Sequence, residues 1–92
     1  MITRIITNHV KEGHRDEYIA VSKAFCAALV ANNGCIEAKV YADTESTDVI
    51  NVEQWPDRET AEVVIKSETF RTFLPQLFPH FAGNETVWMD EV

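Results

Sequence analysis

Residues 49–82 read VINVEQWPDRETAEVVIKSETFRTFLPQLFPHFA and decide the fold of this chain. The segment begins as an apolar strand, Val49 to Trp55, turns at Pro56-Asp57 and continues with apolar residues at helical spacing. A second helical start at Ser67 precedes four of the five phenylalanines, which are Phe70, Phe73, Phe78 and Phe81. We expect this segment to form the wall of any ligand pocket.

Two residues of this segment can cap helices, and one proline interrupts it. Asp57 and Ser67 carry side-chain oxygens that accept hydrogen bonds from the first free N–H groups of a helix. Pro75 removes a backbone donor and clashes with the preceding turn of a helix. The sequence therefore predicts a kink or break near residues 72–75, after which Pro79 starts a last short turn.

Hydrophobic periodicity predicts the other elements. They are a strand over residues 2–10, a helix over residues 15–33, a strand over residues 35–42 and a final strand over residues 86–92, once Gly83-Asn84 has ended the second helical segment. The order β-α-β-β-α-β is the ferredoxin-like α+β pattern. We therefore expect one domain over residues 1–92, with a four-stranded antiparallel sheet and both helices on one face.

The two faces of this sheet are predicted to differ. On the first strand, Arg4 and Asn8 alternate with aliphatic residues on the face turned to the helices, where buried polar groups need partners. The opposite face is expected to carry Thr7, His9 and Tyr41. A chain of 92 residues with an uncovered sheet face favours self-association. Two such sheets packed face to face form a dimeric α/β barrel, so we expect a homodimer.

Composition restricts the classes of partner. A net charge of −7, with eight scattered Lys and Arg residues, argues against a nucleic-acid surface. No apolar run approaches the roughly 20 residues that span a bilayer, and the first ten residues lack the apolar core of a secretory signal. We therefore expect a cytoplasmic protein that binds neither nucleic acid nor membrane. Cys26 and Cys35 fit no zinc or CxxC pattern, which predicts two buried free thiols.

Aromatic residues are the first candidates for a small-molecule site. Phe70, Phe73 and Phe81 can line a pocket for a flat aromatic substrate, and the alternative is an aromatic stripe that fills the core. Trp55 is either a pocket wall with an indole donor or a packing residue at the edge of the sheet. Tyr41 is a further candidate for the wall.

Asn8 and His80 are the polar candidates. Asn8 can orient a substrate oxygen from the apolar face of its strand, or it can hydrogen-bond nearby loops. His80 carries an imidazole suited to accept the proton of a phenol, or it is an exposed residue near a helix end. The three histidines show no metal-ligand spacing, so we expect no metal site.

Short motifs along nearly the whole chain resemble one family. They are Val10-Lys11-Glu12-Gly13, Gly34-Cys35, Tyr41-x-Asp43, Glu53-x-Trp55 and Ser67-x-x-Phe70. In their joint order and spacing they resemble the antibiotic biosynthesis monooxygenase domain of the dimeric α/β-barrel superfamily. Glu12 is a departure, because this family often has proline at that position.

The resemblance implies a ferredoxin-like domain that dimerises through its sheet. It also implies an activity within a family that includes cofactor-independent oxygenases of aromatic polyketides and quinols. We therefore predict a monooxygenase without cofactor that acts on a small aromatic or quinol-type substrate, with Asn8, Trp55 and His80 in the reaction. The alternative is a non-catalytic, dimeric small-molecule-binding or stress-related module.

Haem degradation, another activity of the resembling family, is not expected. Haem-degrading relatives use an Asn on the first strand and a Trp and a His on the second helix. Here Val64 and Leu74 stand at the Trp and His positions, and His80 lies too far along the chain to replace them.

Overall fold

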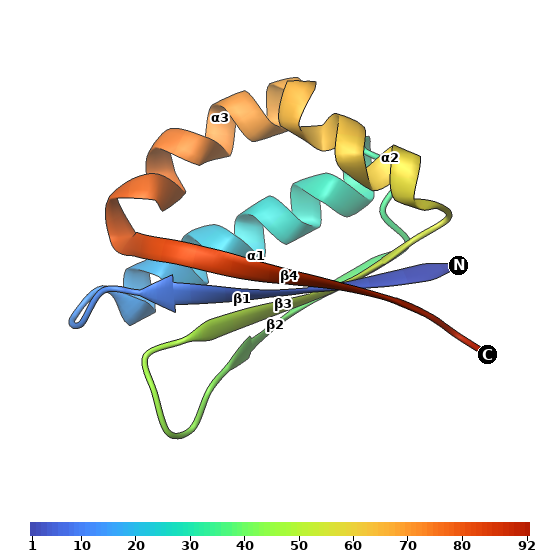
Figure 1. Ribbon diagram of the computed structural model, residues 1–92. Coiled ribbons are helices and arrows are strands. Elements are labelled where there is room, and N and C mark those ends of the chain that lie inside the picture. The colour runs from blue at the N-terminus through green and yellow to red at the C-terminus, as the bar shows by residue number, and fades with distance from the viewer.

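The computed structural model describes residues 1–92, and its elements follow the expected order (Figure 1). The strands and helices are β1 (Ile2–Val10), α1 (Arg15–Asn32), β2 (Glu37–Ala42), β3 (Val49–Trp55), α2 (Arg58–Glu62), the 3₁₀ helix η1 (Val63–Lys66), α3 (Glu68–Leu77), the 3₁₀ helix η2 (Phe78–His80) and β4 (Phe81–Asp90). None of these helices combines the length and the apolar character that a membrane span requires.

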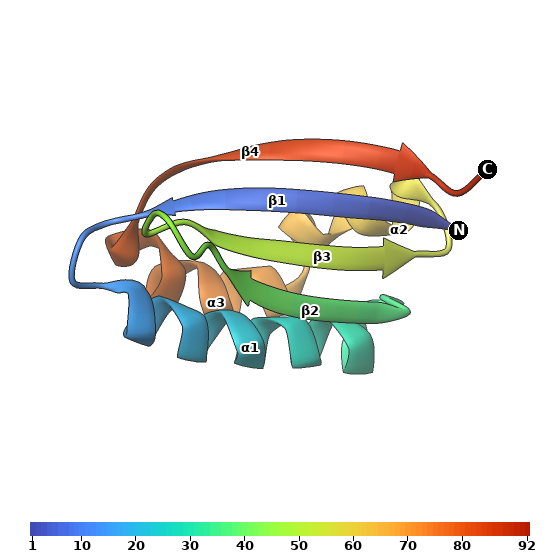
Figure 2. The same cartoon turned by 90° about the horizontal axis from the view of Figure 1, so that it is seen from below.

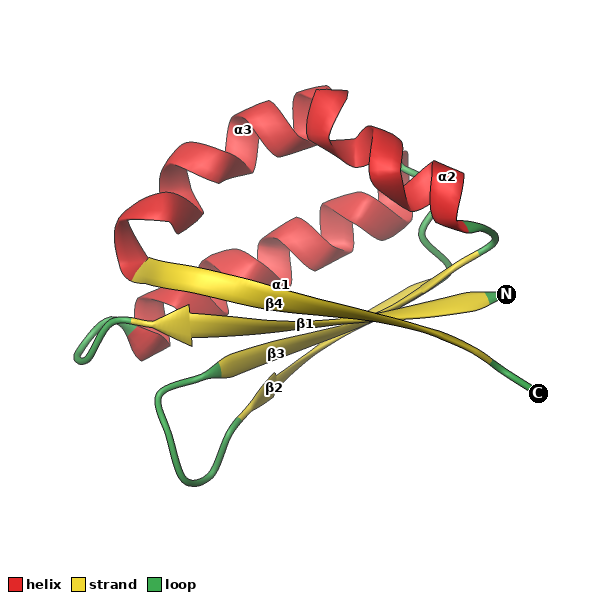
Figure 3. Cartoon of the chain, viewed as in Figure 1, coloured by secondary structure: helices red, strands yellow, loops and turns green.

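The four strands form one antiparallel sheet in the order β2-β3-β1-β4 (Figure 2). All helices cover the same face of this sheet, and the other face carries no element of this chain (Figure 3). This confirms the predicted ferredoxin-like α+β fold, in which each half of the chain contributes one β-α-β unit.

Strand register fixes which side chains meet under the helices. Arg4 pairs with Glu53 across β1 and β3, and Ile6 pairs with Asn51. Because side chains alternate between faces, Arg4, Ile6 and Asn8 share the helix-covered face, as predicted from their spacing. The uncovered face carries an apolar centre that includes Ile5, Ile50, Val52, Val87 and Met89.

Both predicted helix caps are confirmed. Asp57 Oδ1 accepts a hydrogen bond of 2.7 Å from the Thr60 N–H at the start of α2. Ser67 Oγ accepts one of 3.2 Å from the Phe70 N–H at the start of α3. The second helical segment is therefore two helices, separated by the 3₁₀ turn η1.

Of the predicted kink or break near residues 72–75, the break is wrong. The helix α3 runs without interruption through Pro75, and the irregular geometry lies upstream, at Val63–Lys66. Pro75 stands close to the C-terminal end of α3, so its missing N–H leaves only the Arg71 carbonyl without an intrahelical partner. Pro79 does start a short turn, because it lies at the beginning of η2.

The last strand begins at Phe81, five residues before the predicted start. Gly83 therefore does not end a helix but lies inside β4, where it pairs with His9 and has a φ of 145°. The register between β1 and β4 shifts at His9 and Val10. An irregularity of this kind needs the backbone freedom of glycine. The sequence pattern alone had indicated the same glycine as the end of a helix.

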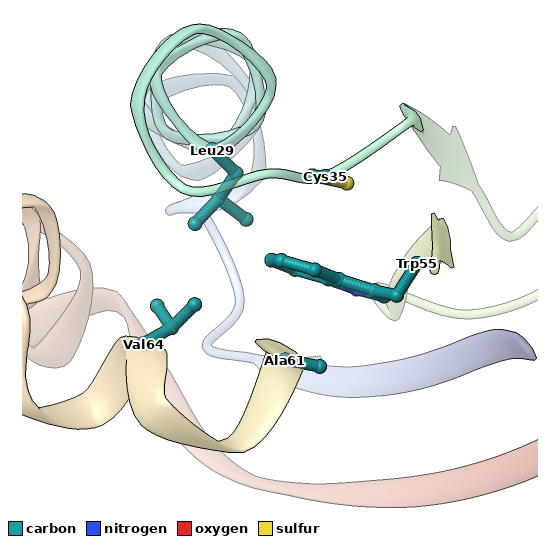
Figure 4. Packing of buried hydrophobic residues seen from close by; sticks show 5 residues of the cluster. All are labelled: Leu29, Cys35, Trp55, Ala61 and Val64. Carbon is teal, nitrogen blue, oxygen red and sulfur yellow. The ribbon is translucent and has the colours of Figure 1, made fainter. Parts of the chain in front are cut away.

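Two apolar clusters hold the helices on the sheet. The Trp55 cluster contains Leu29, Cys35, Trp55, Ala61 and Val64, and in Figure 4 the indole ring extends between α1 and the segment that carries Ala61 and Val64. The Tyr18 cluster contains Val10, Tyr18, Val49 and Leu77. They lie at opposite ends of the β1–β3 pair, because Ile2 faces Trp55 and Asn8 faces Val49. Phe25 packs against both clusters.

Candidate functional site

A cavity of about 460 Å³ lies between the helix-covered face of the sheet and the helices, and we call it the aromatic cavity. Eleven of its eighteen lining residues are hydrophobic. Its helical wall includes Phe70, Leu74 and Leu77 of α3, and Phe25 lines it from α1. This composition suits a small, mostly apolar ligand.

The sheet side of the aromatic cavity is polar, which is unusual for the interior of so small a protein. We call this side the floor of the cavity, and its polar residues are Arg4, Asn8, Asn51 and Glu53. Asn8, Asn51 and Glu53 are each at most 5% exposed. Buried polar groups are costly unless they are hydrogen-bonded, so their partners define the site.

One part of this floor is an ion pair held by a tryptophan. Arg4 donates to Glu53 Oε1 from Nε at 2.9 Å and from Nη2 at 2.6 Å. Trp55 Nε1–H donates to the same oxygen at 2.9 Å. The Arg4 guanidinium also lies 5.6 Å from the Trp55 ring centroid and 5.2 Å from that of Trp88, within the range of cation–π attraction. Three hydrogen bonds, two from Arg4 and one from Trp55, therefore hold Glu53 Oε1 in place.

The other part of the floor is an amide network. Asn8 Nδ2 donates to the Val49 carbonyl at 3.1 Å and to Asn51 Oδ1 at 2.6 Å. Asn51 Nδ2 in turn donates to Ser22 Oγ at 2.8 Å and to Cys26 Sγ at 3.3 Å. These contacts tie the sheet to α1 and set the orientation of both amides.

The structure brings three of the proposed site residues to the aromatic cavity. Asn8 lies in its floor, and Phe70 and Phe81 lie in its walls. Phe73 does not line it, because its ring packs on Phe25 with centroids 5.4 Å apart. Trp55 is fully buried in the Trp55 cluster and reaches the cavity only through its hydrogen bond to Glu53.

His80 and Tyr41 lie elsewhere. His80 Nδ1 is 3.0 Å from His14 Nδ1, and its Nε2 is 3.8 Å from Glu17 Oε2, so it faces the start of α1. Tyr41 is 51% exposed and pairs with Ile50 on the uncovered face of the sheet. Neither side chain lines the aromatic cavity. Alternation along β2 turns Tyr41 away from the helices, onto the face predicted for it from the sequence.

Asn51 and Glu53 line the cavity but are not among the site residues predicted from the sequence. The sequence does carry a signal for them. They alternate with Ile50 and Val52 and share a face with the buried Val49 and Trp55. Polar residues between two buried apolar ones on the same face indicate a polar floor.

A second, larger depression of about 620 Å³ lies between the end of α1 and the start of α3. Only two of its eight lining residues are hydrophobic, and the others include Asn32, Ser67 and Thr72. Hydrophobic and aromatic linings are typical of small-molecule sites, so the aromatic cavity is the better candidate. No group of three or more His, Cys, Asp or Glu side chains is arranged to hold a metal ion.

Both cysteines are free and buried, as predicted. Burial raises the pKa of each thiol to about 11, and the Glu53 carboxylate adds to the effect. Because the thiolate is the reactive form, we expect neither thiol to react with iodoacetamide at pH 8 in the folded protein. Mass spectrometry should find both alkylated after unfolding in urea. Labelling of the native protein at the unfolded rate would contradict this prediction.

The same shifts predict a loss of stability at high pH. The ordinary pKa of a thiol is 9.0, so the folded protein holds these protons more tightly than the unfolded chain does. Their contribution is complete below pH 9 and is lost as the pH rises from about 9 to about 11. Tyr18 also lowers stability at high pH, because burial raises its pKa to about 12. The urea midpoint should therefore fall across this interval, and less steeply in a variant with serine at both cysteine positions.

The sequence of residues 1–76 matches the family model for antibiotic biosynthesis monooxygenase. No curated protein matches the chain. Among solved structures, a crystal structure described as an antibiotic biosynthesis monooxygenase shares 20% identity, with a TM-score of 0.85, and the match covers 100% of this chain and 99% of that one.

Two further structures are similar over almost their whole length. A conserved protein from Methanosarcina mazei shares 22% identity with a TM-score of 0.83, over 100% of this chain and 94% of its own. A protein from Caulobacter crescentus, described as a candidate antibiotic biosynthesis monooxygenase, shares 20% identity with a TM-score of 0.85, over 99% and 89% respectively. At these identities, the structural similarity establishes the fold.

Proposed function

Because the chain belongs to the antibiotic biosynthesis monooxygenase family, we propose that it is a cofactor-independent monooxygenase of a small, electron-rich aromatic such as a quinol. The observation that carries this proposal is the aromatic cavity, which combines phenylalanine and leucine walls with a hydrogen-bonded polar floor. The walls suit a flat ring, and the floor suits its oxygen atoms.

A quinol can supply all the electrons that this reaction needs. When a hydroquinone with a free ring carbon reacts with O₂ to give a hydroxyquinone and water, the substrate loses four electrons. One oxygen atom becomes the new ring oxygen, and the other leaves as water with two hydrogens of the substrate. The protein then has to bind the ring, exclude water and assist loss of the first hydroxyl proton, since the resulting anion reduces oxygen more readily.

We assign these tasks to residues of the cavity floor. Asn8 contacts the substrate oxygen directly, because it lies in the floor and is held by Asn51. Trp55 acts as a positioning residue, because it does not line the cavity and its indole N–H donates to Glu53. His80 faces His14 rather than the cavity, so its imidazole is the least suited of the three to reach the ring.

Oxygen consumption tests this function. We expect the purified protein to consume O₂ with at least one of a panel of quinols, and Asn8→Ala to lower kcat by roughly tenfold or more. His80→Ala should retain most of the activity, which makes it a control for variants near the helices. If no quinol raises oxygen uptake above the rate without protein, the monooxygenase proposal fails. Binding without uptake would instead support the non-catalytic binding module.

We further propose that the protein is a homodimer through the uncovered face of its sheet. This face exposes Tyr41, Val87 and Met89 by 44 to 54% around the apolar centre of the sheet. Apolar sheet faces of this kind are usually covered. A cytoplasmic location is in keeping with the free state of Cys26 and Cys35, because reducing compartments keep thiols unpaired.

A lysine on this face should dissociate the dimer. Sedimentation should give twice the chain mass of 10.5 kDa for the native protein and the single mass for Val87→Lys at micromolar concentration. Val63→Lys is the matched control, since both valines are 54% exposed but Val63 lies on the helical layer. A native protein that sediments as a monomer would exclude the barrel.

A further inference from the structure

The hydrogen bonds of Glu53 leave one carboxylate oxygen free. All three donors that reach this residue, two from Arg4 and one from Trp55, point at Oε1. No hydrogen bond reaches Oε2, and Glu53 is one of the residues that line the aromatic cavity. The side chain itself is only 2% exposed. A buried carboxylate therefore presents one unpaired acceptor to the cavity.

Asn8 presents a second acceptor. Both hydrogens of its Nδ2 are used, on the Val49 carbonyl and on Asn51 Oδ1, which also fixes the direction of the amide. Its Oδ1 receives no hydrogen bond, and Asn8 also lines the aromatic cavity. The Asn51 amide cannot serve a ligand as donor, because its Nδ2 hydrogens go to Ser22 and Cys26.

Strand register sets the span between these two residues. Asn8 faces Val49 and Arg4 faces Glu53, so the Cα atoms of Asn8 and Glu53 lie four residue levels, or roughly 13 Å, apart along the sheet. The Asn8 amide also reaches Asn51, which lies between these two levels on β3. A benzene ring with hydroxyls at opposite positions, together with two hydrogen bonds of roughly 2.7 Å each, can bridge side chains that extend toward each other from these levels.

We propose that Glu53 Oε2 and Asn8 Oδ1 form a pair of acceptors that selects the reduced, dihydroxy form of an aromatic ligand over its quinone. A hydroquinone donates a hydrogen bond to each oxygen, and the bond to the carboxylate is charge-assisted. A quinone carries only acceptors, so it displaces water and leaves both oxygens unpaired, which is costly in a buried site. The inference rests on the proposed function, because it names which form of the substrate the same cavity binds.

Anaerobic binding measurements test this selection. Tetramethylhydroquinone is a suitable probe, because its fully substituted ring can neither add a thiol nor gain a hydroxyl at a free carbon. Titration calorimetry without oxygen should give an affinity at least about tenfold higher for this hydroquinone than for its quinone or its dimethyl ether. Equal affinities for the three compounds, or tighter binding of the quinone, would overturn the proposal.

Glu53→Gln sharpens the test by exchanging one acceptor for a donor. The donors of Arg4 and Trp55 hold the remaining oxygen of the amide, so its NH₂ takes the place of Oε2. Binding of the hydroquinone should weaken by roughly tenfold, and binding of the quinone should strengthen. The matched control is Glu12→Gln, which removes the same charge from an exposed turn and should change neither affinity. A Glu53→Gln protein that keeps the native preference would refute the role of Oε2.

The two proposals fail separately. If the protein selects the hydroquinone but consumes no oxygen with any quinol, the proposed monooxygenase function is refuted and the proposed acceptor pair is supported. If the protein consumes oxygen yet binds the quinone or the ether as tightly as the hydroquinone, the function is supported and the acceptor pair is refuted.

Discussion

Replacing Trp55 by alanine should lower the free energy of unfolding by about 3 to 5 kcal/mol. The side chain is completely buried, and it lies at the centre of the Trp55 cluster. Truncation leaves a cavity between Leu29 and Val64 and removes a donor from the buried Glu53. Since small domains are stable by roughly 5 to 15 kcal/mol, urea unfolding followed by circular dichroism should find this variant close to unfolded.

Two other tryptophan variants separate the packing of Trp55 from its hydrogen bond. Trp55→Phe keeps most of the ring but loses the N–H that Glu53 accepts, so a smaller loss of about 1 to 3 kcal/mol is expected. Trp88→Ala is the control for removing an indole, because Trp88 is only partly buried at the edge of the same cluster and should cost less. A Trp55→Ala protein as stable as Trp88→Ala would contradict the central role of Trp55.

Replacing Arg4 by methionine should be similarly severe, at about 3 to 5 kcal/mol. The change keeps an unbranched side chain under the helices but leaves the Glu53 carboxylate buried without its counter-charge. Urea unfolding at neutral pH measures this loss.

The double variant Arg4→Met, Glu53→Leu tests the reason for this loss. Replacing both members of a buried ion pair by apolar residues is often neutral or stabilising, so most of the stability should return. Its binding of hydroquinone should not return, since the carboxylate is gone. If the double variant were as unstable as Arg4→Met, packing of the arginine stem rather than unpaired charge would explain the loss.

Much of this fold follows from local patterns in the sequence. Alternation placed Arg4 and Asn8 under the helices, and the side-chain oxygens of Asp57 and Ser67 marked two helix starts that the structure confirms. These features depend on a few neighbouring residues, which a sequence shows directly. The wrong predictions concern residues that are compatible with two different local structures. Gly83 suits a helix end or an irregular strand, and Pro75 disturbs a helix less near its end.

The site was harder to predict, because it depends on contacts between distant residues. The sequence indicated Asn8 and the phenylalanines, but it could not show that Phe73 packs on Phe25 instead of facing the cavity. His80 meets His14 across 66 positions of the chain, a contact set by tertiary packing. In the sequence, Glu53 appears only as part of a family motif, because its role depends on the hydrogen bonds from Arg4 and Trp55 that the fold creates.

The separation of the Trp55 cluster from the Tyr18 cluster has a consequence for motion. Apolar packing holds the two ends of the β1–β3 pair, while the middle is a polar floor beneath the aromatic cavity. Regions that share few apolar contacts can open independently, so amide hydrogens at the two ends should exchange with solvent at separate rates. A ring bound in the cavity would touch groups near both clusters and make them open as one unit. Ligand binding would then be recorded as slower exchange at both ends of the sheet.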